Sequence, residues 1–168
     1  MGRLRRLFDL RGEDRFVLPL VAPLFLFVVA ANVVTTAFAR ALFITHNDYD
    51  QLPWMFIGAS TFTALASLVY VSLIGRVSMQ RRFVGLIGLA VVSFSLLGTL
   101  FPEDPKAWSL LVFTWTTGVS QLILIQTWSY SAALLPVRQA RRLFPLFSAA
   151  ATLGAAGGGV LTTGLMQV

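Results

Sequence analysis

Histidine, cysteine and carboxylate side chains, which carry most acid–base and metal chemistry, are few in this chain of 168 residues, and they avoid its apolar stretches. The chain has no cysteine and a single histidine, His46, with Asp48 and Asp50 close behind it. General acid–base catalysis needs a positioned partner for such a histidine, and zinc or calcium sites need several clustered ligands. The sequence therefore predicts a protein that is not an enzyme and that holds no metal ion and no cofactor.

Neutral polar residues inside the apolar stretches form two stripes with helical spacing. Asn32, Thr35 and Thr36 stand at i, i+3 and i+4, so they share one face of a helix. A second stripe runs from Thr114 to Gln121. Polar side chains at bilayer depth are costly unless they face protein or water, so the stripes predict the wall of a substrate path. The alternative is ordinary hydrogen bonding between helices. The residues of the predicted substrate path are Asn32, Thr35, Thr36, Thr114, Thr117, Gln121 and Trp128.

The elements that position these stripes are five long stretches without a charged residue. Hydrophobic residues make up 57% of the chain and charged residues 12%, against roughly 25% charged in soluble proteins. Each stretch is long enough to cross a hydrocarbon core of roughly 30 Å as a helix. We expect an all-α membrane protein with a basic segment at 1–15 and a transmembrane bundle at 16–168. Its five helices are expected at about 16–40, 53–75, 83–101, 107–135 and 143–168.

The first stretch follows basic residues and ends in small residues, as a secretory signal peptide does. It is longer than a typical apolar signal segment of roughly 7–15 residues, and four more stretches follow it. We therefore expect the first stretch to stay in the protein as a membrane helix.

Basic residues between the stretches lie on alternate sides and predict an orientation. Eleven of the thirteen Lys and Arg residues fall on the side of the N-terminus, and only Arg40 and Lys106 fall on the other. Short loops rich in Lys and Arg stay in the cytoplasm, so we expect the N-terminus inside and Val168 outside, in a bacterial inner membrane. Because the charges border the membrane, the expected partner is the lipid bilayer and not nucleic acid. The predicted cytoplasmic basic rim is Arg76, Arg81, Arg82, Arg138, Arg141 and Arg142.

The last stretch is rich in small residues that allow helices to approach closely. Gly154 and Gly158 form a GxxxG pair, and Gly157 widens it. Such patterns occur where two membrane helices pack backbone against backbone. These three glycines are therefore predicted to lie in a helix-packing face.

The segment 139–148, Gln-Ala-Arg-Arg-Leu-Phe-Pro-Leu-Phe-Ser, leads into an Ala/Gly run that ends at Gly159. Together they resemble the nucleotide (ATP/ADP) transporters, which belong with the major facilitator-like carriers. The preceding aromatic segment with Trp128 and Tyr130 fits the same order, and the loop 75–82 looks like the basic cytoplasmic loop of facilitator proteins. The chain departs from that family in having no Lys or Glu within its apolar stretches.

The resemblance implies an N-terminal half of a facilitator-type carrier that lacks its sixth helix, because such halves consist of six helices in inverted triplets. It implies transport of nucleotides or other small anionic metabolites, with the remainder of the transporter as a missing partner. Helices one and four of such a half line the central cavity. The alternative is a membrane anchor or signalling scaffold that keeps the carrier fold without transport.

Overall fold

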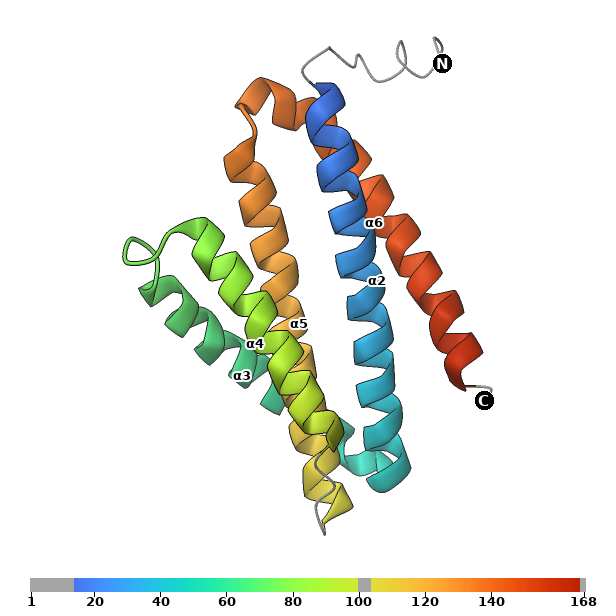
Figure 1. The fold of residues 1–168 in the computed structure, drawn as a ribbon. Coiled ribbons are helices and arrows are strands. Elements are labelled where there is room, and N and C mark those ends of the chain that lie inside the picture. Colours follow the sequence, from blue (N-terminus) through green and yellow to red (C-terminus); the bar gives the residue numbers. More distant parts are fainter. Residues whose placement is uncertain (1–13, 100–103, 167–168) are drawn as a thin grey trace. The chain divides into compact units, whose positions relative to one another are not determined.

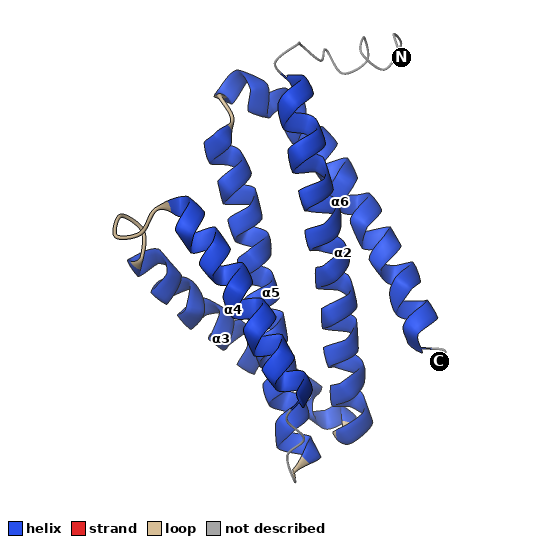
Figure 2. Ribbon diagram, in the orientation of Figure 1, coloured by secondary structure: helices blue, strands red, loops and turns tan. Residues whose placement is uncertain are grey.

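Five long helices make up nearly all of the described chain (Figures 1 and 2). The computed structural model describes residues 14–99 and 104–166. Nearly all of the predicted basic segment 1–15, and Val168, lie outside this part. The long helices are α2 (Asp14–His46), α3 (Leu52–Ser72), α4 (Met79–Thr99), α5 (Pro105–Leu134) and α6 (Val137–Met166). A short 3-10 turn, η1 (Tyr49–Gln51), precedes α3.

The prediction of an all-α, multi-pass membrane protein is confirmed for the described residues. All five long helices are long and apolar enough to cross a membrane, and no strand occurs in residues 14–99 and 104–166. Three helices extend further than the charge pattern predicts, since α2 continues to His46, α4 already begins at Met79 and α6 already begins at Val137. Charged residues mark where a helix leaves the hydrocarbon, but they do not end it, because backbone hydrogen bonding continues in water.

Local sequence signals explain where the helices start and stop. The Asp104 carboxylate accepts hydrogen bonds from the backbone N–H groups of Lys106 at 2.9 Å and Ala107 at 3.3 Å, which caps α5. Pro105 is the first residue of α5, where its missing N–H has no consequence. Gly75 supplies the positive φ of 87° in the turn between α3 and α4. These turns set the lengths of the helices that surround the candidate sites.

The helices divide into two compact units, and α2 and α5 contribute to both. Of the described residues, the first unit contains 14–33 and 127–166, and the second contains 34–99 and 104–126.

The core of the first unit is aromatic and lies between α2 and α6. Phe25 and Phe147 are fully buried and stack with ring centroids 5.4 Å apart. Gly154 and Gly158 lie against the backbone of α2, since a Cβ on them would be 2.2 Å from the Leu26 carbonyl oxygen and 2.8 Å from that of Ala30. Residue numbers rise together in both helices, so α2 and α6 run parallel. The first and the fifth of five successive membrane crossings, here α2 and α6, are expected to run in the same direction.

The core of the second unit joins α2, α3 and α5. Its buried residues are Ala39, Phe43, Met55, Ala59, Val112 and Phe113. Gly118 lies against α3, because a Cβ on it would be 2.3 Å from the Phe62 ring. The contacts Gly58 to Thr114, Phe62 to Gly118 and Tyr70 to Gln126 all join residues 56 positions apart. Helices α3 and α5 therefore run parallel in a fixed register, as two even-numbered crossings do.

Candidate functional site

Two contacts in the second unit show which side of α5 faces α2. The Asn47 side-chain amide donates to the Ser109 hydroxyl at 2.6 Å, and the rings of Phe43 and Phe113 are 6.2 Å apart. In both pairs the residue number falls on α2 as it rises on α5, so the two helices are antiparallel here. The register, continued along the helices, brings Thr36 level with Ser120.

The predicted stripe on α5 divides between two directions. Thr114 lies toward α3, where its hydroxyl is 3.9 Å from a Cβ built on Gly58. A helix turns by roughly 100° per residue, so Thr117 and Gln121 fall between this α3-facing side and the side of Phe113, which faces α2. The same register brings Thr35 level with Gln121. The second unit thus places four predicted path residues at neighbouring levels of α2 and α5: Thr35, Thr36, Thr117 and Gln121.

Thr117 differs from the other hydroxyl residues of its surroundings. Its hydroxyl is buried and has no hydrogen-bond partner among the described residues. Thr63 and Ser67 on α3 instead donate to the backbone carbonyls four residues earlier, both at 2.7 Å. A buried hydroxyl without a partner costs roughly 1–3 kcal/mol. Thr117 is therefore a point where a water molecule or a bound solute would satisfy a polar group of the protein.

Asn32 and Trp128, the remaining predicted path residues, belong to the first unit. The Trp128 ring packs against Phe25, with centroids 4.4 Å apart, and against Phe144 at 6.0 Å. It is half-buried among the residues of the aromatic core. Asn32 is half-buried on α2. In this unit Trp128 holds α2, α5 and α6 together.

A line of small buried hydroxyl residues on α5 escaped the sequence analysis. Five of the six buried polar residues of the described chain are spaced 7, 4, 7 and 4 positions apart, which keeps them on one face of the helix. They are Ser109, Thr116, Ser120, Thr127 and Ser131. The alternating intervals of seven and four residues are visible in the sequence and predict a shared packing face.

A second feature that sequence reasoning missed joins α3 to α5 near the basic turn. The Tyr70 hydroxyl donates to the side-chain oxygen of Gln126, which is 2% exposed. The amide nitrogen of Gln126 is buried and has no partner among the described residues. The Arg82 guanidinium lies over the Tyr70 ring, 5.3 Å from its centroid, a cation–π distance. No local signal links two residues 56 positions apart, so only the fold reveals this pair.

The predicted basic rim consists of two groups, one in each unit. In the second unit Arg76 and Arg81 are exposed and Arg82 is half-buried. The first unit carries Arg138, Arg141 and Arg142 in the first two turns of α6. Positive charge near a helix N-terminus opposes the helix dipole. The helix dipole therefore does not account for these arginines.

Among the described residues, no group of three or more His, Asp or Glu side chains is close enough to hold a metal ion. No protein-family model, curated protein or solved structure matches this chain. The resemblance to facilitator-type carriers therefore rests on the sequence motif around 126–159 alone and stays a prediction. What the chain itself establishes is a multi-pass helical membrane protein with a neutral polar zone on α2 and α5.

Proposed function

We propose that the chain is the membrane-spanning module of a facilitator-type carrier for a nucleotide or another small anionic metabolite. The observation that carries the proposal is the buried, unpaired hydroxyl of Thr117 beside Gln121 on α5. Thr35 and Thr36 on α2 lie at neighbouring levels, so neutral donors and acceptors from two helices gather in one zone. A solute can exchange its hydration for such groups without meeting a fixed charge in the membrane.

The arginines outside the spanning segments fit a carrier of anions. A cluster of like charge raises the local concentration of an oppositely charged solute and speeds its arrival. The neutral zone then binds the solute by hydrogen bonds while the helices move between two orientations around it. In this scheme the arginines attract the solute and the Thr/Gln zone discriminates between solutes.

Transport of labelled solute into proteoliposomes tests the proposal. The protein is reconstituted and exposed to radiolabelled ATP or ADP, with and without unlabelled nucleotide inside the vesicles. Changing Thr117→Val together with Gln121→Leu is expected to reduce uptake roughly tenfold, the effect of losing one or two hydrogen bonds to the solute.

Thr152→Val is the matched control, because this exposed hydroxyl on α6 donates only to the Ser148 carbonyl, at 2.9 Å. Uptake that survives in the double variant but falls in the control would contradict the assigned zone. Absence of uptake by the folded wild-type protein, for nucleotides and for a panel of small anions, would refute transport.

A membrane anchor or scaffold is the second candidate, and one observation favours it. Gly154 lies against the backbone of α2, and Gly118 lies against the Phe62 ring of α3, so both units contain tightly packed helix pairs. Rigid packing suits a scaffold more than a carrier that must change shape. A folded protein that transports no solute would support this second function.

A further inference from the structure

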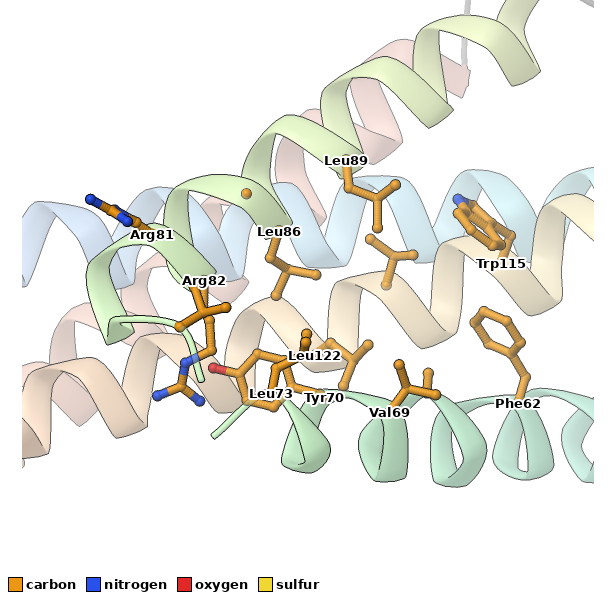
Figure 3. A pocket seen from close by; sticks show the side chains of 14 residues that line it. Phe62, Val69, Tyr70, Leu73, Arg81, Arg82, Leu86, Leu89, Trp115 and Leu122 are labelled. Atoms are coloured by element: carbon orange, nitrogen blue, oxygen red, sulfur yellow. The ribbon is translucent and has the colours of Figure 1, made fainter. Parts of the chain in front are cut away.

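A cavity of about 520 Å³ lies in the second unit between α3, α4 and α5 (Figure 3). Helix α5 contributes Trp115, Val119 and Leu122, which point away from Thr117 because they lie roughly 140–200° around the helix from it. The cavity is therefore separate from the polar zone of the proposed carrier function. Its volume falls within the roughly 300–1,000 Å³ typical of ligand sites.

The two ends of the cavity differ in chemistry. Figure 3 shows Arg81 and Arg82 at one end and Phe62 and Trp115 at the other. Phe62 and Tyr70 are eight positions apart on α3, so the wall between them is roughly 12 Å long. Between the ends the wall consists of aliphatic side chains from all three helices, and no Asp or Glu takes part in it. A ligand that fits this wall has a long apolar body and one anionic end.

The arginines at the polar end have unused capacity to bind an anion. The Arg82 Nε–H is buried and has no hydrogen-bond partner among the described residues. Arg81 is exposed beside it on the first turn of α4. Arginine donates in a planar fork that matches the oxygens of a phosphate group. With no carboxylate in the wall to neutralise them, the two guanidinium groups favour a ligand with negative charge.

We propose that this cavity binds an anionic phospholipid of the bilayer. The lipid phosphate accepts hydrogen bonds from Arg81 and Arg82, and one acyl chain extends along the cavity toward Trp115. The surrounding membrane supplies this ligand, and the loop between α3 and α4 lies where head groups are found. The cavity does not depend on the polar zone of the proposed carrier, because it uses the opposite side of α5; only Arg81 and Arg82 are common to both proposals.

A lipid suits both ends of the cavity better than a further apolar helix does. An apolar transmembrane helix satisfies its own backbone and brings no negative charge, so it would leave the buried Arg82 Nε–H without an acceptor. An acyl chain matches the aliphatic wall, and the lipid phosphate supplies the missing acceptor.

Quenching of tryptophan fluorescence by brominated lipid tests the site directly. The full chain is placed in nanodiscs of phosphatidylcholine that contain increasing phosphatidylglycerol with brominated acyl chains. The Trp115 signal is the difference between wild type and Trp115→Phe. We expect brominated phosphatidylglycerol to quench this signal at low content. The same quenching by brominated phosphatidylcholine should require roughly ten times as much lipid.

Two variants and one control locate the binding. Arg81→Gln with Arg82→Gln is expected to remove the preference for phosphatidylglycerol, and Leu89→Trp is expected to block the cavity. Leu89 is 49% exposed, so the larger side chain does not threaten folding, which far-UV circular dichroism checks. Because that variant adds a tryptophan, its binding is measured by native mass spectrometry of retained phosphatidylglycerol. Arg138→Gln with Arg141→Gln, an exposed pair on α6, is the control and is expected to keep the preference.

Three outcomes would overturn the proposal. Equal quenching by both lipids would mean that the arginines do not select an anionic head group. An equal loss in the α6 control would mean that general surface charge produces the preference. Displacement of the lipid by millimolar inorganic phosphate would identify a soluble anion, and not a phospholipid, as the ligand.

Discussion

The closest contact between helices in the first unit yields a graded prediction for three glycines of α6. A Cβ on Gly154 would lie 2.2 Å from the Leu26 carbonyl oxygen, and one on Gly158 would lie 2.8 Å from the Ala30 carbonyl oxygen. A Cβ on Gly157 would meet no atom within 4 Å. We therefore expect alanine to destabilise the protein most at Gly154, less at Gly158 and not at Gly157.

The magnitude follows from the movement that each alanine requires. Ordinary contact begins at 3.4 Å, so α2 and α6 must separate by about 1.2 Å at Gly154 and by about 0.6 Å at Gly158. The obstacle is backbone, which cannot rotate aside as a side chain does. Overpacking of this kind costs roughly 1–3 kcal/mol. Alanine also gains roughly 1 kcal/mol of helix propensity over glycine at all three positions, so comparison with Gly157→Ala cancels that gain.

Unfolding in mixed micelles with increasing SDS, followed by far-UV circular dichroism, measures the difference. Gly154→Ala should unfold at a clearly lower SDS fraction than Gly157→Ala, with Gly158→Ala between them. Equal midpoints for Gly154→Ala and Gly157→Ala would refute the close approach of α2 and α6. A lower unfolding midpoint for Gly157→Ala alone would mean that the side of α6 carrying Gly157, and not the side carrying Gly154, packs against α2.

Two further predictions concern the second unit and the orientation of the chain. Tyr70→Phe leaves both polar atoms of the buried Gln126 side chain without a partner, so it should lower the free energy of unfolding by roughly 1–3 kcal/mol. Tyr49→Phe is the control, because Tyr49 is exposed, and it should leave the SDS midpoint unchanged. An unchanged midpoint in Tyr70→Phe would mean that the pair does not form. The chain has no cysteine, so Asp50→Cys and Ser78→Cys can each be labelled with a membrane-impermeant maleimide in intact cells. The distribution of arginines predicts labelling at residue 50 and none at residue 78, and the reverse pattern would invert the proposed orientation.

Some features of the candidate site were readable in the sequence because they depend on local spacing. The positions i, i+3 and i+4 place Asn32, Thr35 and Thr36 on one face of any helix, whatever surrounds it. The turn at Gly75 and the cap at Asp104 are likewise local, and the structure contains both. Helix ends predicted from the charged residues were less accurate, since α2 and α6 continue past arginines that mark only the edge of the hydrocarbon.

Other features depend on which helices meet, and local spacing carries no such information. The hydrogen bond between Tyr70 and Gln126 joins residues 56 positions apart, and the register of α3 against α5 brings them together. The cavity next to Arg82 likewise needs three helices to form its wall. Thr117 and Thr114 look equivalent in the sequence, yet only the Thr117 hydroxyl is buried and unpaired.

The sequence by itself determined that this protein crosses a membrane with helices, because apolar length and the absence of internal charge fix how each segment partitions between water and lipid. It also determined which residues share a face of each helix. The tertiary structure alone decided which faces meet: glycines of α6 against α2, Gly118 against Phe62, and an aliphatic wall with two arginines at one end. In lipid, apolar burial does not select among apolar faces, so close steric fit and a few buried polar contacts make that choice.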